Sequence, residues 1–129
     1  MAVPYVVTER GKPGDPAAPK KFYAQAKSSG ELTFRQLAKE ISEAGTTVSD
    51  TDVIAVLNDL VKIMRRNLSN GKIVRLGDFG AFQLSFGSEG AETEAKCSGS
   101  LIRNPKVLFR PGPDLRDMLL TLKYTKTAK

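Results

Sequence analysis

The sequence predicts an α+β fold in which a β-hairpin comes first, two helices follow, and three strands and a short helix complete the chain. Two segments between Thr33 and Gly71 repeat apolar residues at the three- and four-residue spacing of helices. On either side of them, short segments alternate apolar and polar residues and are separated by glycine- and proline-rich turns. With 129 residues, of which 40% are hydrophobic, the chain has enough apolar material for one core.

The N-terminal segment predicts a β-hairpin with a long, stiff connection. Val3–Arg10 has the composition of a strand, and Lys20–Lys27 alternates apolar and polar side chains. The connection, Gly11–Pro19, contains three prolines and two glycines and is therefore a loop. We expect an N-terminal extension over residues 1–30 and a main domain over residues 31–129.

Two helices are predicted by residues that begin and end helices. Thr33 opens a Thr-x-x-Gln pattern, in which the two side chains can satisfy free backbone N–H groups of the first turn, and Gly45 ends this helix. The second helix begins after Ser49, whose partner in the first turn is Asp52, and it ends at Gly71.

The second helix has more apolar surface than a small monomer can bury. Its apolar residues cover about half of its circumference, whereas a surface helix needs a stripe of only somewhat more than ~100°. A helix deep in a monomer core would show the same pattern, but a body of two short helices cannot surround it. We therefore expect burial against a second copy of the chain. The dimer core is predicted to contain Val53, Leu57, Leu60, Met64, Phe79 and Phe82.

The remaining strands flank a polar excursion. Ile73–Leu76 and Phe79–Phe86 are predicted strands around a turn at Gly77–Asp78, and Leu101–Phe109 is the returning strand. The stretch between them, Gly87–Gly99, is rich in Gly, Ser and Glu and has no large apolar side chain that could join a core.

The chain is expected to end in a short helix and a basic tail. Pro113 and the carboxylates after it are typical of a helix start. The helix is indicated by the spacing of Leu115, Leu119 and Leu122. The tail contains Lys123, Lys126 and Lys129.

The composition argues against an enzyme. The chain has no histidine, the side chain most used in acid–base catalysis and metal binding, so we expect no catalytic residues, no metal, no cofactor and no small-molecule substrate. Its 20 Lys and Arg outnumber 14 Asp and Glu, for a net charge of +6. This charge favours a polyanionic partner, although it would also suit a ribosomal protein.

The sequence predicts a cytoplasmic protein. No apolar run approaches the ~18 residues that span a bilayer, and the N-terminus lacks the features of a secretory signal. The single cysteine, Cys97, suits a reducing compartment. We expect no membrane partner.

Two motifs resemble those of the HU and integration host factor family of bacterial histone-like proteins. The segment Asn70–Phe82 (NGKIVRLGDFGAF) resembles the family signature in which a helix ends in Gly and a strand leads to Gly-Phe-Gly-x-Phe. The segment Val107–Gly112 (VLFRPG) resembles the Val-x-Phe-Lys-Pro-Gly that precedes the family's final helix. The resemblance covers Leu32–Lys123, and residues 1–30 look like the extension of the HU-like proteins of Bacteroides-type bacteria.

This resemblance implies an HU-like homodimer. Each chain would have a two-helix body, an antiparallel three-stranded sheet with a protruding β-arm at about residues 87–106, and a short C-terminal helix. In the family, two arms embrace the minor groove, and a proline at each tip wedges between base steps and bends the duplex. The implied function is sequence-independent DNA binding by a nucleoid-associated protein that condenses DNA.

The arm departs from the family pattern. The family tip carries Arg-Asn-Pro, but here Arg103-Asn104-Pro105 lies only four residues before Phe109 and far beyond Phe82. Two paired strands must have similar lengths, so the turn is expected around Thr93–Gly99 and Pro105 is expected at an edge or a bulge near the base. The outgoing strand carries glutamates where the family has arginines, and these are expected to repel phosphates. They are Glu89, Glu92 and Glu94.

Basic residues of the strands, the arm and the C-terminal end are the candidates for phosphate contacts, because Lys and Arg bind phosphates without reading bases. No helix carries a set of Arg, Asn and Gln suited to base edges. The expected partner is double-stranded DNA, and the alternative is an HU-shaped module that binds protein instead. The DNA-binding candidates are Lys72, Arg75, Lys96, Arg103, Lys106, Arg110, Arg116, Lys123 and Lys126.

Overall fold

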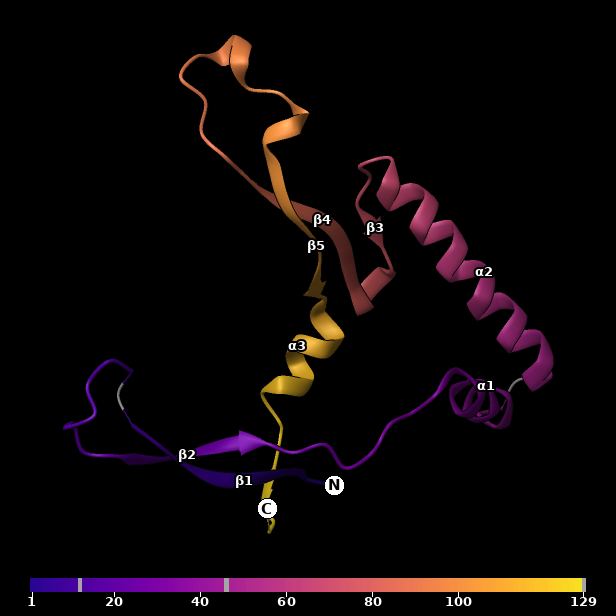
Figure 1. Ribbon diagram of the computed structural model, residues 1–129. Coiled ribbons are helices and arrows are strands. Elements are labelled where there is room, and N and C mark those ends of the chain that lie inside the picture. The colour runs from indigo at the N-terminus through magenta and orange to yellow at the C-terminus, as the bar shows by residue number, and fades with distance from the viewer. Residues whose placement is uncertain (12, 46, 129) are drawn as a thin grey trace. The chain divides into compact units, whose positions relative to one another are not determined.

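The computed structural model describes residues 1–11, 13–45 and 47–128 and has the α+β class predicted from the sequence (Figure 1). The chain forms two compact units, Phe34–Asp117 and Met1–Thr33 with Met118–Lys129. Within the described ranges, no helix has both the length and the apolar character that a membrane crossing requires. The elements are β1 (Val3–Arg10), β2 (Lys21–Ala26), α1 (Phe34–Glu43), α2 (Asp50–Ser69), β3 (Val74–Arg75), β4 (Gly80–Ser88), β5 (Ile102–Pro111), α3 (Pro113–Leu119) and β6 (Tyr124–Lys126), with 3-10 turns at Gly77–Phe79, Glu94–Lys96 and Gly99–Leu101.

The start of α2 is fixed by the cap predicted from the sequence. Ser49 has an extended backbone, and its hydroxyl oxygen accepts a hydrogen bond of 3.2 Å from the Asp52 N–H. Asp50 and Asp52 place negative charge at the positive end of the helix dipole. At the other end, Gly71 has a positive φ of 81°, which ends the helix as predicted.

The larger unit combines the α1–α2 pair with an antiparallel sheet in the order β3-β4-β5. Arg75 pairs with Ala81, and Ala81 pairs in turn with Arg110. The β4–β5 ladder continues to the pair of Ser88 with Ile102 and leads into the arm. The loop of the arm is drawn in orange at the top of Figure 1. The loop therefore spans residues 89–101, and its middle coincides with the turn expected around Thr93–Gly99.

Pro105 lies in a bulge of β5, as expected from strand lengths. The register shifts between the pairs Ser85–Lys106 and Gly87–Arg103, so two β5 residues, Asn104 and Pro105, oppose one residue of β4. Asn104 has a positive φ of 54°, and Pro105 has no N–H to leave unpaired in the ladder.

The smaller unit contains a three-stranded sheet rather than the predicted two-stranded hairpin. β1 and β2 are antiparallel, as expected, but β6 adds to the free edge of β1 in parallel, with Val3 opposite Tyr124 and Tyr5 opposite Lys126. The expected basic tail is therefore wrong for Lys123 and Lys126, because backbone hydrogen bonds tie this segment to β1. Lys129 lies outside the described residues.

Two related boundaries also change. The leucine spacing predicts a last helix that includes Leu122, but α3 ends at Leu119. The Thr121 N–H and hydroxyl both donate to the Met118 carbonyl oxygen. The expected domain of residues 31–129 loses its C-terminal end to the smaller unit, because β6 pairs with β1.

Two glycines allow the turn after β3 to lie against the end of β5. The Gly112 N–H donates to the Phe79 carbonyl oxygen at 2.9 Å, and the Leu76 N–H donates to the Gly80 carbonyl oxygen at 2.8 Å. Gly80 has a φ of 151°, and a Cβ there would lie 2.5 Å from the Arg110 carbonyl oxygen. A side chain at this crossing would force the backbones apart.

We predict that Gly80→Ala destabilises the fold by about 1–3 kcal/mol, because it adds both backbone strain and a clash. Urea unfolding measures this change. Gly90→Ala is the matched control, since nothing lies within 4 Å of a Cβ at that position and its φ is not in the positive range. Equal stability of the two variants would contradict this reading of the crossing.

Candidate nucleic-acid interface

The sheet of the larger unit has one polar and one apolar face. Because side chains alternate along a strand, Ala81, Gln83 and Ser85 of β4 lie on the face opposite to Phe82, Leu84 and Phe86. The register places Arg110 and Lys106 on the polar face, opposite Ala81 and Ser85 respectively. The polar face therefore carries the cations and the other face carries the aromatic rings.

Three arginines surround a shallow hollow on the polar face. Arg75 comes from β3, Arg110 from β5, and Arg116 from α3, and we call them the arginine face. The hollow has a volume of about 410 Å³, and the small residues Gly80 and Ala81 are among those that line it. Small residues between long cations leave room for a phosphate to approach the backbone.

The arginine face has cations that other groups do not neutralise. Within the described part of the chain, none of its three side chains has a hydrogen-bond or ion-pair partner, and no carboxylate lines the hollow. The described residues also contain no cluster of His, Cys, Asp or Glu that could hold a metal. Three free guanidinium groups around one hollow are suited to a phosphate backbone.

Two predicted lysines are exposed in the same unit. Lys106 shares the polar face of β5 with Arg110 and lies toward the base of the arm. Lys72 follows α2, where its backbone N–H donates to the Asn67 carbonyl oxygen at 3.0 Å. Neither side chain lines the hollow of the arginine face.

The predicted arm cations are already engaged. Arg103 donates from Nε to the Glu89 carboxylate at 3.1 Å and from one terminal nitrogen to the carbonyl oxygens of Ser100 and Ile102. Lys96 lies 3.6 Å from Glu92. Each pair leaves its cation less free for phosphate. The same pairs also neutralise two of the three arm carboxylates, so the expected repulsion is weaker than the sequence indicated.

Lys123 and Lys126, two further candidates, are not part of the arginine face. Both belong to the smaller unit, where the Lys123 carbonyl oxygen accepts a hydrogen bond of 2.7 Å from the Val3 N–H and Lys126 lies on β6. The nine candidates are thus divided between the arginine face, its surroundings, the arm and a separate sheet.

The other face of the sheet and α2 form an uncovered apolar groove. Leu60, Met64, Phe79 and Phe82, four of the six predicted core residues, line this groove of about 580 Å³. Phe79 is 47% exposed, and Val107, which also lines the groove, is 57% exposed. The centroids of the Phe109 and Phe82 rings lie 4.8 Å apart, so the two rings pack together on this face.

Two of the predicted core residues lie elsewhere. Val53 on α2 is already buried within a single chain, and Leu57 is only half-buried on the same helix. Ala38 and Val53 are the buried apolar side chains among the described residues. The larger unit therefore has very little core of its own.

The sequence analysis missed Gln83 and the small residues of the hollow. Gln83 lies on the polar face and lines the hollow together with Gly80 and Ala81. The strand alternation that assigned Phe82 and Leu84 to one face also implies that Gln83 lies on the other, so that signal was present. The role of Gly112 depends on contacts between distant residues and had no local signal.

The fold has known relatives. A solved protein of Bacteroides vulgatus ATCC 8482, described as a "Putative bacterial DNA binding protein", superposes with a TM-score of 0.65 at 11% sequence identity. The match covers 97% of this chain and 48% of that protein, so this chain spans about half of its length. No curated protein matches the chain.

The family assignment comes from a second comparison. The model of the HU-HIG family, described as an HU domain fused to wHTH, Ig, or glycine-rich motif, matches residues 1–126. This match includes the N-terminal extension as well as the HU-like part that the two sequence motifs indicated. The chain therefore belongs to the HU-HIG family.

Proposed function

We propose that the chain binds double-stranded DNA through phosphate contacts and does not read base sequence. The observation that carries this proposal is the arginine face, where Arg75, Arg110 and Arg116 surround one hollow without a carboxylate partner in the described chain. The description of the Bacteroides vulgatus protein and the HU domain of the family support the same function. An enzymatic role is not part of the proposal.

The arginine face is suited to backbone contacts rather than base readout. Arg75 and Arg110 come from two strands and Arg116 comes from the short helix α3, so no single recognition helix presents the three side chains to a major groove. The charges of the arginine face attract phosphates of any sequence. A protein of this kind would act in the nucleoid, where neutralised phosphates help DNA to condense.

The DNA-binding form is proposed to be a homodimer. The apolar groove exposes large side chains from both α2 and the sheet, and an exposed apolar surface of this kind marks an interaction site. A second copy supplies the same apolar surface about a two-fold axis, so each chain can cover the other's groove. The dimer would also double the number of arginine faces.

The arm is proposed to contribute little by intercalation. Pro105 lies in the β5 bulge, between the residue pairs Ser85–Lys106 and Gly87–Arg103. The loop of residues 89–101 contains no proline. Bending by a proline wedge at the tip therefore has no side chain to perform it.

We predict that Arg75→Ala/Arg110→Ala weakens duplex binding and lowers its salt dependence. The double variant removes up to four phosphate contacts per dimer, so the log–log slope of affinity against salt should fall by about 3–4 units. Fluorescence anisotropy of a labelled duplex over a range of salt concentrations measures this slope. Lys39→Ala is the control, because it removes a cation on α1 that does not line the hollow of the arginine face.

Two outcomes would count against this interface. An equal loss in Lys39→Ala would mean that net charge alone governs binding. A flat salt response of the wild-type protein at measurable affinity would favour the alternative module that binds protein instead of DNA.

We predict that the wild-type protein sediments as one dimeric species at micromolar concentration. Leu60→Lys should unfold the chain or leave it monomeric, because it places a charge in the apolar groove. Sedimentation velocity and circular dichroism separate these two results. Lys62→Ala, on the same helix, should leave the dimer intact. A folded wild-type monomer would refute the proposed dimer.

We predict that Pro105→Ala changes DNA bending little. The residue occupies the β5 bulge and not the tip, so its removal should leave the arm in place. Energy transfer between dyes at the two ends of a short duplex reports the bend. Loss of the bend in this variant would show that the bulge itself contacts DNA.

A further inference from the structure

The positive charge of the chain is concentrated in the smaller unit. Its two segments, residues 1–33 and 118–129, contain eight Lys and Arg and three Asp and Glu, for a net charge of +5. The larger unit, residues 34–117, has 12 Lys and Arg and 11 Asp and Glu, for a net charge of +1. Most of the net positive charge that attracts a polyanion therefore belongs to the smaller unit and not to the larger unit.

One face of this sheet carries aromatic side chains. Alternation along β1 puts Val3, Tyr5 and Val7 on one face, and the register adds Tyr124 opposite Val3 and Lys126 opposite Tyr5. On the β2 side the same face continues with small residues, because Ala26 pairs with Tyr5 and Ala24 pairs with Val7. Two rings, a neighbouring ammonium group and two alanines thus share one surface.

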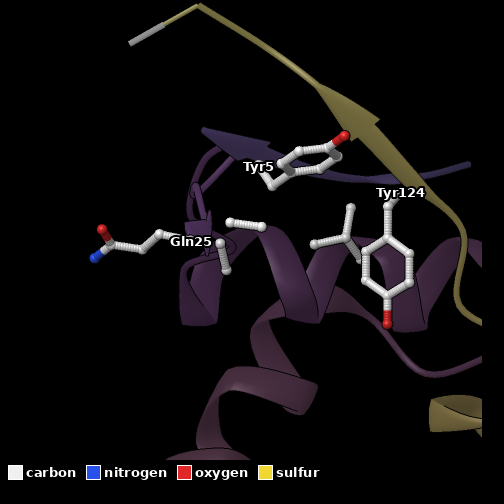
Figure 2. A pocket seen from close by; sticks show the side chains of 6 residues that line it. Tyr5, Gln25 and Tyr124 are labelled. Atoms are coloured by element: carbon white, nitrogen blue, oxygen red, sulfur yellow. The ribbon is translucent and has the colours of Figure 1, made fainter. Parts of the chain in front are cut away.

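The rings border an open hollow of about 470 Å³. Figure 2 shows Tyr5 on β1 and Tyr124 on β6 beside this hollow, while the Gln25 side chain extends away from both rings. Tyr124 is 64% exposed, and no carboxylate lines the hollow. A volume of this size lies within the ~300–1,000 Å³ that is typical of sites for small organic groups.

We propose that the β2-β1-β6 sheet binds single-stranded nucleic acid by stacking unpaired bases on Tyr5 and Tyr124. Lysines of the smaller unit, such as Lys126 on the same face, contact the phosphates. Aromatic rings on a positively charged sheet are the arrangement with which proteins hold single strands, because each base has a flat face to stack. Lysines alone would bind a duplex equally well. The exposed Tyr124 ring, with the half-buried Tyr5 ring beside it, favours a ligand whose bases are free.

This surface is separate from the proposed duplex site. The arginine face belongs to the larger unit, and none of its residues lines the tyrosine hollow. A chain with both surfaces would have one site for a duplex and another for a single strand. The two activities are therefore expected to be lost through different substitutions.

The chain offers an intrinsic probe of this site. Its three tyrosines, Tyr5, Tyr23 and Tyr124, all lie in the smaller unit, and the chain has no tryptophan. Tyrosine emission therefore reports on this sheet alone. Oligothymidylate added to the wild-type protein should quench the emission, whereas inorganic polyphosphate, which has the charge but no bases, should quench much less.

Substitutions then test the stacking. Tyr124→Ala should weaken binding of labelled oligothymidylate about 5- to 150-fold, and Tyr124→Phe should bind as the wild type does. Tyr23→Ala is the matched control, because Tyr23 pairs with Thr8 and lies on the opposite face of the sheet. Arg75→Ala/Arg110→Ala should retain oligothymidylate binding while losing duplex affinity, and Tyr124→Ala should do the reverse.

Several outcomes would overturn the proposal. Polyphosphate that quenches and competes as well as oligothymidylate would reduce the site to a charged surface. The same conclusion follows if Tyr124→Ala lowers the affinity for oligothymidylate by less than about threefold, or if Tyr23→Ala lowers it as much as Tyr124→Ala does. Quenching of the wild-type protein needs no variant, so a Tyr124→Ala chain that unfolds would not prevent the test. Oligouridylate run in parallel distinguishes an RNA from a DNA ligand.

Discussion

The crossing of backbones at Gly80 and Gly112 sets the geometry of the larger unit. The hydrogen bond from Gly112 to Phe79 joins the end of β5 to the turn before β4, and this contact fixes the register in which Arg75, Ala81 and Arg110 lie side by side. A slip of one residue in a strand would exchange its two faces. The arginine face and the apolar groove therefore depend on the same contact.

The parts of the fold that could be predicted from the sequence have short-range causes. Ser49 caps α2 through a residue three positions away, and Gly71 ends the helix through its own backbone angle. The position of the arm loop followed from a comparison of strand lengths, which also placed Pro105 away from the tip. These features need no knowledge of which distant segments meet.

The parts that could not be predicted involve distant partners. Tyr124–Lys126 has only three residues, too few for a periodic signal, and it becomes a strand because β1, more than a hundred positions earlier, offers a free edge. The ion pair of Arg103 with Glu89 likewise forms across the arm and changes the role of both residues. Candidate cations chosen by sequence position therefore included two, Arg103 and Lys96, that the fold pairs with carboxylates.

The distribution of charge matters more than its total. The chain's net charge of +6 suggested a polyanionic partner, yet the HU-like unit contributes only +1 of it. Charges act mainly within a Debye length of ~8–10 Å at physiological salt, so a nearly neutral unit can still present a positive face where its cations gather and its carboxylates lie elsewhere. The arginine face meets this condition by geometry, because three guanidinium groups meet at one hollow. The smaller unit meets it by composition, because its eight cations outnumber its three carboxylates.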